Sequence, residues 1–167
     1  MKKELRENFE GRVKQILKTS LNSKNITKAI NTYAVPVLTY SFGIVRWNDT
    51  ELEELERRVR IWMTENRWWH PKSAIERLTL LRYKGERGIT SLKWLKDCQI
   101  MKISKYFQKK KEETTLHKAR VEADRGITTA RLQEVENNEN GVRSKGDREE
   151  ELIQQWRRKV VHGKYPY

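Results

Sequence analysis

The sequence predicts an all-α protein, a small helical bundle with a less ordered helical appendage at its C-terminal end. Apolar residues recur at steps of three and four along most of the 167 residues, which is the period of an amphipathic helix. No stretch alternates apolar and polar residues over the length of a strand. The chain is only 36% hydrophobic but contains six Trp and six Tyr, a content that indicates a modest core rather than a disordered chain.

The first helix is expected at about residues 3–21. Its apolar stripe consists of Leu5, Phe9, Val13, Ile16 and Leu17. The polar stretch 21–25 breaks this helix, and Ser23 or Asn25 is a suitable N-cap for the next one. A second helix is therefore expected directly after the break.

In the second helix, Pro36 removes one backbone donor, so a kink is expected near residues 32–36. Residues 34–45 carry no charge, which predicts the most buried part of the chain. Thr50 with Glu53 fits a capping box that opens a third helix. The apolar stripe of this third helix is Leu52, Leu55, Val59, Trp62 and Met63.

Ser73 with Glu76 fits a second capping box, which opens a short helix. The apolar positions of this short helix are Ile75, Leu78 and Leu81. After a turn at Gly85 and Gly88, a long helix is expected from about Ser91 to Lys111. Its inward positions are Leu92, Leu95, Ile103 and either Tyr106 or Phe107.

The chain changes character after residue 112. Helices are possible at 112–124 and 127–135, and a polar loop follows at 137–146. Asp147 with Glu150 then caps a last helix, whose apolar positions are Leu152, Ile153, Trp156 and Val160. Four segments follow from this pattern: bundle helices at 1–66, a basic helical segment completing the bundle at 67–112, a loosely ordered linker at 113–146, and a C-terminal helix and tail at 147–167.

Composition excludes several classes of protein. No run approaches the roughly 18 apolar residues of a membrane span, and the charged N-terminus lacks the apolar core of a signal peptide. Cys98 is the single cysteine, so neither an intrachain disulfide nor a thiolate-cluster zinc site is possible. An intracellular location is expected, and the short run Lys109–Lys111 does not decide between nucleus and cytoplasm.

The positive charge is concentrated in one segment. The whole chain has a formal net charge of +13, and residues 67–111 contain thirteen bases and three acids, giving +10. Clustering of this kind is typical of proteins that bind a polyanion, because each Lys or Arg placed on a phosphate releases condensed counterions. The alternative is a solvated basic face that serves solubility.

The residues from Arg67 to Arg87 are the candidate nucleic-acid site. Arginine forks hold phosphate oxygens, and flat aromatic side chains stack on bases. Trp68 and Trp69 are, however, better explained as anchors in the core. The candidate binding residues are Arg67, His70, Lys72, Arg77, Arg82, Lys84 and Arg87.

No catalytic constellation is visible in the sequence. The four Asp are widely separated, whereas two-metal chemistry needs converging carboxylates. The three His and one Cys have no zinc-site spacing, and no glycine-rich phosphate loop is present. We therefore expect no metal, no cofactor and no enzymatic activity of this chain.

An ordered series of motifs resembles a known family. The stretch Ile30–Tyr40, followed by Gly43-Ile44 and Trp47, resembles the segment after the catalytic palm in LINE-like (non-LTR) retrotransposon reverse transcriptases, particularly the site-specific groups. Similar positions continue through Leu52, Leu55, Arg57, Arg60, His70-Pro71-Lys72-Ser73, Arg77-Leu78, Arg82, Gly85 and Arg87-Gly88-Ile89. A later group resembles the linker of those proteins: Trp156, Lys159, His162, Gly163 and the aromatic Tyr165.

The resemblance implies a thumb, a helical bundle that grips the template–primer duplex, together with part of the linker. RNA–DNA hybrid or structured RNA is the implied partner, and His70, Lys72, Arg77, Arg82 and Arg87 occupy the matching polar positions. Two residues depart from the pattern: Glu86 stands where a second glycine is usual, and Leu81 where a proline is common. Fingers, palm, zinc knuckle and endonuclease are missing, so the chain resembles a fragment that does not polymerise alone.

Two other hypotheses remain open beside a nucleic-acid-binding remnant. The surface that would face the missing palm, around Tyr40, Phe42, Trp47 and Trp62, would support a helical interaction module or self-association. The other hypothesis is that the chain is an unselected pseudogene product. In that case its thermal unfolding would not be cooperative.

Overall fold

The described part of the chain folds into helices joined by turns and loops. The computed structural model describes residues 1–80, 88–124, 150, 151, 153–155, 157 and 158. In chain order the helices are α1 (Lys2–Leu17), α2 (Ser23–Ala29), the π-helix η1 (Ile30–Ala34), α3 (Val35–Thr39), α4 (Asp49–Glu65), α5 (Glu76–Thr79), α6 (Leu92–Lys111) and α7 (Thr115–Ala123). No strand occurs within these ranges, so the predicted all-α bundle is confirmed.

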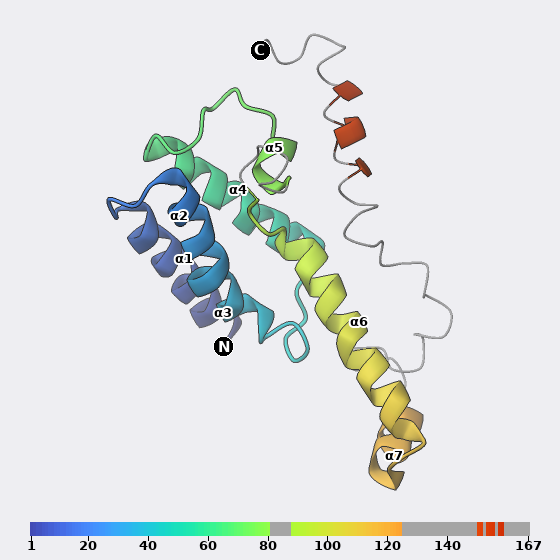
Figure 1. Ribbon diagram of the computed structural model, residues 1–167. Coiled ribbons are helices and arrows are strands. Elements are labelled where there is room, and N and C mark those ends of the chain that lie inside the picture. The colour runs from blue at the N-terminus through green and yellow to red at the C-terminus, as the bar shows by residue number, and fades with distance from the viewer. Residues whose placement is uncertain (81–87, 125–149, 152, 156, 159–167) are drawn as a thin grey trace.

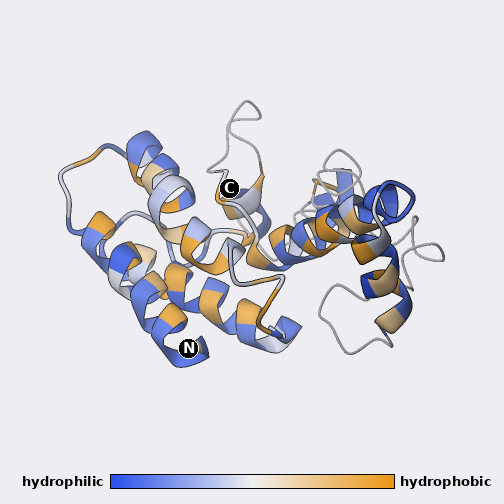
Figure 2. Ribbon diagram, turned by 90° about the horizontal axis from the view of Figure 1, so that it is seen from below, coloured by the Kyte–Doolittle hydropathy of each residue, from blue (hydrophilic) through white to orange (hydrophobic). Residues whose placement is uncertain are grey.

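The bundle is built from α1, α2–η1–α3 and α4, and α6 extends away from it. Figure 1 shows α6 starting beside α4 and running outward to the turn where α7 folds back. Bands of apolar residues (orange) alternate with polar ones along the helices in Figure 2. The largest fully buried side chains are Phe9, Phe42, Ile26, Ile30, Leu38, Leu52, Leu55 and Met63. None of the helices in the described ranges combines the length and apolar character needed to cross a bilayer.

The end of α1 differs from the prediction in length and in the cap that follows. α1 stops at Leu17 rather than near residue 21. Asn22, not Ser23 or Asn25, is the N-cap of α2, and its side chain accepts a hydrogen bond from the Asn25 amide at 2.9 Å. Asparagine is among the strongest N-cap residues, because its short side chain reaches the free amides of the first turn.

The predicted kink before Pro36 takes the form of a π-turn. Across Ile30–Ala34 the helix widens, and the amide of Val35 donates to the carbonyl of Ile30. The missing N–H of Pro36 leaves the regular α pattern incomplete at this point. The wide turn also carries Asn31, whose side-chain amide donates to the Gly88 carbonyl (2.8 Å) and accepts from the Thr90 amide (3.0 Å). Asn31 therefore fastens the segment before α6 to the bundle.

The charge-free stretch 34–45 is only partly buried. Ala34, Leu38 and Phe42 are buried, as predicted, but Tyr40 is 81% exposed and Ile44 is 77% exposed. The helix turns its other face to solvent, so the absence of charge identified one buried face and not a buried segment.

α4 begins two residues earlier than predicted. The capping box is formed by Asn48 and Glu51, not by Thr50 and Glu53, and the Glu51 carboxylate accepts the Asn48 amide at 2.9 Å. The predicted stripe of α4 is confirmed, because Leu52, Leu55, Val59 and Met63 are buried and Trp62 packs against the core.

The predicted capping box at Ser73 and Glu76 does not form. α5 is a single turn that starts at Glu76, whose own side chain is buried, and Ile75 is 45% exposed. The third apolar position predicted for this helix, Leu81, lies outside the described residues. The long helix α6 matches its expected bounds.

The start of α6 is held to α4 by side chains. The Glu56 carboxylate of α4 accepts the Leu92 amide at 2.6 Å, which satisfies a free N–H of the first turn. Asp49 at the start of α4 pairs with Lys93 (2.9 Å) and with Lys96 of α6. Hydrogen bonds from Lys96 and then from Lys93 hold the pKa of the Asp49 carboxyl below its ordinary value.

A second, smaller apolar cluster joins α6 and α7. Val121 is buried against Ile103 and Phe107. Phe107, rather than the 54%-exposed Tyr106, is therefore the inward aromatic residue of α6. Of the segment predicted as a loose linker (113–146), residues 115–123 form the helix α7, and residues 125–146 lie outside the described part. The helix predicted at 127–135 lies there too, as do Trp156 and Val160 of the last helix.

Candidate nucleic-acid interface

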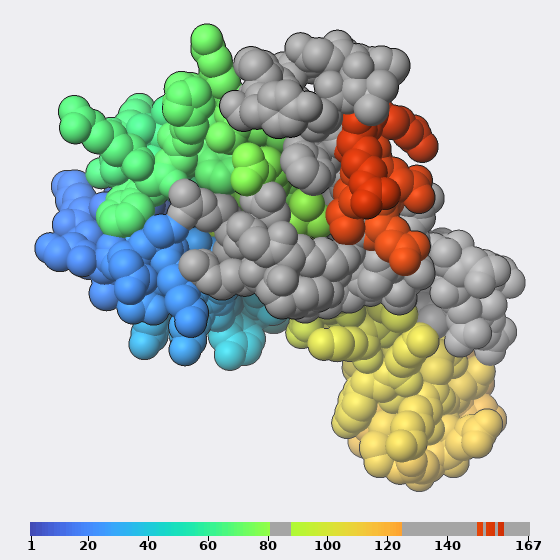
Figure 3. Space-filling model, turned by 45° about the horizontal axis from the view of Figure 1, so that its top comes forward, coloured from blue at the N-terminus to red at the C-terminus, as the bar shows by residue number. Residues whose placement is uncertain are grey.

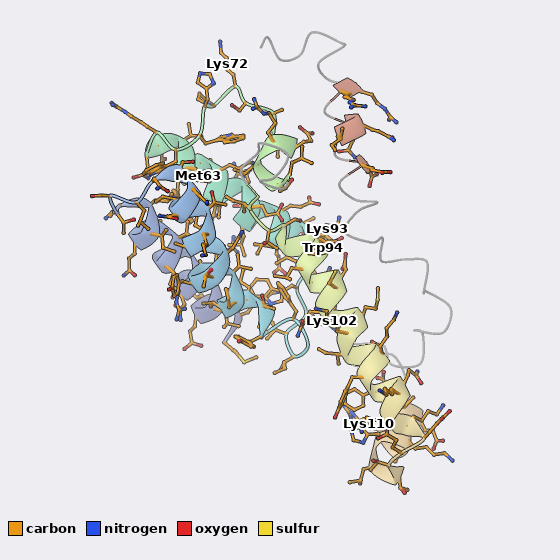
Figure 4. The ribbon with its side chains drawn as sticks, viewed as in Figure 1. Met63, Lys72, Lys93, Trp94, Lys102 and Lys110 are labelled. Carbon is orange, nitrogen blue, oxygen red and sulfur yellow. The ribbon has the colours of Figure 1, made fainter. Side chains whose placement is uncertain are left out.

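The basic loop comprises Arg67, His70 and Lys72, between α4 and α5. All three side chains are exposed, and Arg77 on α5 is exposed beside them. Figure 4 shows Lys72 at the edge of the molecule, pointing away from the bundle. The structure thus leaves these four predicted residues open to solvent, three of them on the connection from α4 to α5 and the fourth on α5. Arg82, Lys84 and Arg87 lie outside the described residues.

A helix-stop motif fixes where the basic loop begins. Arg67 has a left-handed backbone (φ 60°). Its amide donates to the Thr64 carbonyl at 3.0 Å, and the Trp68 amide donates to the Met63 carbonyl at 2.8 Å. These two bonds are the pattern of a Schellman motif, which usually places glycine at the left-handed position. An arginine there is conformationally costly, because its Cβ crowds the backbone.

The two tryptophans that follow anchor the loop to the core. Trp68 and Trp69 both pack against the buried cluster. The Trp68 indole Nε1–H donates to the Leu17 carbonyl at 3.2 Å, which satisfies a carbonyl in the last turn of α1. The structural interpretation of these indoles is therefore confirmed. The His70 Nδ1 accepts the Lys72 amide at 3.2 Å, a short-range bond that shapes the tip of the loop.

The basic loop lacks the neutralising acids found elsewhere in the molecule. Glu76 is the single acid between residues 66 and 80, and its side chain is buried. Within the described part of the chain, Arg67, His70 and Lys72 make no ion pair.

Some cations of the bundle, in contrast, bind acids on neighbouring helices. Lys2 pairs with Glu51 at 2.5 Å, and Arg58 pairs with Glu10 at 2.9 Å. Lys14 is instead placed over the Trp62 ring, 4.6 Å from its centroid. These bundle charges therefore join helices, whereas the charges of the basic loop face solvent, as do those of Lys18, Lys24 and Lys28.

Sequence reasoning missed a second group of cations. Lys102, Lys105 and Lys109 of α6 are exposed and make no ion pair or hydrogen bond among the described residues. Their spacing of three and four places them on one face of the helix. No acid occurs between Asp97 and Glu112. This spacing within an acid-free run was the signal that could have identified the group.

A cavity near α5 is too small to be a ligand site. It has a volume of about 40 Å³ and is lined by Phe9, Ile30, Val59, Leu78, Glu56 and Arg60. This volume accommodates about two or three waters. Burial lowers the pKa of the Arg60 guanidinium, and nearby Glu56 opposes that change. Among the described residues, no cluster of His, Cys, Asp and Glu could hold a metal ion.

Comparisons with known proteins identify no relative. No family model matches the chain, and neither a curated protein nor a solved structure matches it. The resemblance to the thumb of a retrotransposon reverse transcriptase therefore stays a prediction. The residues predicted as its linker motif, Trp156, Lys159, His162 and Gly163, lie outside the described part of the structure.

Proposed function

We propose that this chain is a non-catalytic nucleic-acid-binding module that holds a duplex by its phosphates. The proposal rests on the basic loop, whose residues Arg67, His70 and Lys72 are exposed and make no ion pair among the described residues. By contrast, bundle cations such as Lys2 and Arg58 are paired with acids. Exposed cations that make no ion pair exchange their counterions for phosphate at little cost.

The form of nucleic acid follows from what the loop offers. A helical RNA–DNA hybrid or structured RNA presents regularly spaced phosphates, and such duplexes are recognised mainly by shape and backbone. The basic loop carries cations on a firmly anchored turn, without an element suited to enter a groove and read base edges. The ordered resemblance to a reverse-transcriptase thumb and linker supports the same assignment.

The test is fluorescence anisotropy with a labelled RNA–DNA hybrid at several salt concentrations. The double variant Arg67→Gly/Lys72→Ala should weaken binding and reduce the slope of log K against log salt by about 2, since each phosphate contact contributes about 0.9. Lys24→Ala/Lys28→Ala on α2 removes the same two charges elsewhere and is the matched control. If the slope of log K against log salt were the same for the loop variant and the control variant, the proposal would be contradicted.

A second candidate function is self-association. Tyr40 and Ile44 are 81% and 77% exposed, and large apolar side chains gathered at a surface mark contact sites. The predicted interaction surface is corrected in part, because Phe42 and Trp47 belong to the core with 1% and 6% exposure. The Trp47 indole donates to the Ser41 hydroxyl at 2.9 Å, so this ring is committed to the fold.

Light scattering across a concentration series measures this second function. A mass that rises with concentration, and that returns to the monomer in Tyr40→Ser/Ile44→Ser, would support self-association. A monomer at all concentrations would exclude it.

A further inference from the structure

The outer part of α6 presents one continuous exposed face. We call Lys102, Lys105, Tyr106 and Lys109 the α6 ridge. All four side chains are exposed, and helical geometry places them within about 100° of one another around the axis. The buried Ser104 and the half-buried Phe107 lie on the other side of the helix, and Phe107 packs against Val121 of α7. Figure 3 shows the end of α6, with α7, standing out from the bundle.

Tyr106 is held in place although it is exposed. Its ring makes T-shaped contacts with Phe107 (centroids 5.8 Å, 87°) and with His117 of α7 (5.9 Å, 75°). More than half of the residue nevertheless remains open to solvent. An aromatic ring held by two neighbouring rings is already oriented before a ligand arrives, which reduces the entropy lost on binding.

The charge around this ring is one-sided. Lys102 and Lys109 lie four residues before and three after Tyr106, and Lys105 lies next to it. Two acids follow the ridge: Glu113 forms an ion pair with Lys110, and the exposed Glu112 makes no ion pair, so no lysine of the ridge is paired among the described residues. Lysine ammonium groups bind phosphates as point charges. The ridge therefore suits a polyanion that also has a flat surface to place on Tyr106.

A single-stranded nucleic acid has both properties. Base–aromatic stacking needs an unpaired base, because the faces of paired bases are already covered by their neighbours in the helix. We propose that the α6 ridge binds single-stranded nucleic acid, with Tyr106 stacking on a base and the three lysines holding the adjoining phosphates. The ridge has no feature that reads the 2′-hydroxyl, so RNA and DNA strands bind alike. This site is separate from the basic loop, as the positions of Lys72 and Lys102 in Figure 4 show.

The lysines are tested with fluorescein-labelled oligo(dT) and oligo(U) of about 12 nucleotides, a length within the usual range for one binding site. In Lys102→Ala/Lys105→Ala/Lys109→Ala, the slope of log K against log salt should fall by about 2, at about 0.7 per contact. The control Lys18→Ala/Lys24→Ala/Lys28→Ala has the same net charge and should keep the slope. Equal loss in both variants would overturn the proposal.

Tyr106 is tested by its ring rather than its charge. Tyr106→Leu should weaken binding of both oligonucleotides by about 5- to 100-fold, the range for losing one stacked base. The salt slope should not change. Tyr106→Phe keeps the aromatic face and should bind like the parent chain. Unchanged affinity in Tyr106→Leu, with circular dichroism showing an intact fold, would overturn the stacking role.

The proposals for the two nucleic-acid sites can be tested independently of each other. Arg67→Gly/Lys72→Ala should weaken binding of the RNA–DNA hybrid but leave binding of oligo(dT) unchanged, and the ridge variants should do the opposite. If the ridge variants instead weaken the duplex alone, the ridge is a duplex site and the single-strand proposal is wrong. If Tyr106→Leu changes the mass by light scattering, the ridge is a contact between copies of the chain, which also overturns the proposal.

Discussion

Arg67 both ends helix α4 and exposes a positive charge in the basic loop. At the end of α4 it takes the left-handed conformation that a Schellman stop needs, although glycine takes this conformation far more easily. A strained residue that exposes its charge is a candidate for function, because a purely structural position would favour glycine.

We expect Arg67→Gly to stabilise the protein by about 1 kcal/mol, since the left-handed conformation costs an L-residue roughly 1–2 kcal/mol and the added freedom of glycine in the unfolded chain offsets part of the gain. Urea denaturation measures the change. Arg67→Ala loses the same charge but keeps the Cβ, so it should show no such gain. A gain of equal size in Arg67→Ala would attribute the effect to charge.

Asp49 makes stability depend on acidity. The folded pKa of the Asp49 carboxyl is below the ordinary value of about 3.9. The stability that Asp49 contributes through Lys93 and Lys96 is therefore complete at pH values above this ordinary pKa, and it is lost as the pH falls through the folded pKa. Asp49→Asn should therefore lower stability at neutral pH by about 0.5–1 kcal/mol, the range of exposed pairs. It should also reduce the decline below pH 4. Thermal melts across pH measure both effects, and Glu7→Gln, at a far more exposed pair, should match the parent.

At the scale of the element, the start of α6 depends on a residue 36 positions earlier. Glu56 supplies the acceptor for the Leu92 amide from another helix. Local sequence around Ser91 contains no sign of this contact, because Ser91 makes no side-chain cap.

Glu56→Ala should destabilise the protein by about 1 kcal/mol, the usual cost of losing a cap. It should also speed hydrogen exchange in the first turn of α6. Glu56→Gln keeps an acceptor oxygen and should lose less. A first turn with unchanged exchange in Glu56→Ala would show that α6 starts independently of this bond.

Element type and apolar stripes were predictable, whereas caps were not. The stripes on α1 and α4 follow from a period of 3.6 residues, which many positions enforce together. The caps depend on single hydrogen bonds. At the start of α4, Asn48 is the N-cap although Thr50, two positions later, also fits the pattern. Ser73 fits the capping-box pattern, yet the chain makes a turn there because the buried side chain of Glu76 begins α5 instead. A pattern of two residues is weaker than a stripe of five.

At the scale of the whole molecule, the described part has two apolar clusters of different size. The large one holds the bundle, and the small one, with Val121 at its centre, holds α7 on α6. Elements with few buried contacts open more readily than the main core.

We expect Val121→Ala to release α7 while the bundle remains folded. Hydrogen exchange should be about tenfold faster in α7, which corresponds to about 1.4 kcal/mol, and exchange in α1 should be unchanged. Phe9→Ala, in the large cluster, should accelerate exchange throughout the bundle. Equal acceleration of α1 and α7 in Val121→Ala would show a single cooperative unit.

The net charge of the sequence predicted which segment holds the candidate site, but not which cations within that segment are free of ion pairs. Net charge identified residues 67–111, and the aromatic pattern directed attention to Arg67–Arg87. Which cations remain without partners depends on contacts between distant helices: Lys93 and Lys96 belong to the same segment but bind Asp49. The pairing of Lys93 and Lys96 with Asp49 therefore required the three-dimensional structure, whereas the acid-free run around Lys102, Lys105 and Lys109 is visible in the sequence.

The π-turn at Ile30–Ala34 has a consequence for how the gene tolerates change. A turn of this kind accommodates one residue more than a regular helix of the same height. Deleting a single codon there would let the chain continue as a uniform α-helix with the residues on either side still in phase, because the wide turn holds the extra residue locally. A codon deleted from a regular stretch, such as the middle of α4, would instead rotate one half of the helix by about 100° relative to the other. Single-codon deletions should for this reason be tolerated better within 30–34 than in the middle of α4, as long as Asn31 and its bonds to Gly88 and Thr90 are kept.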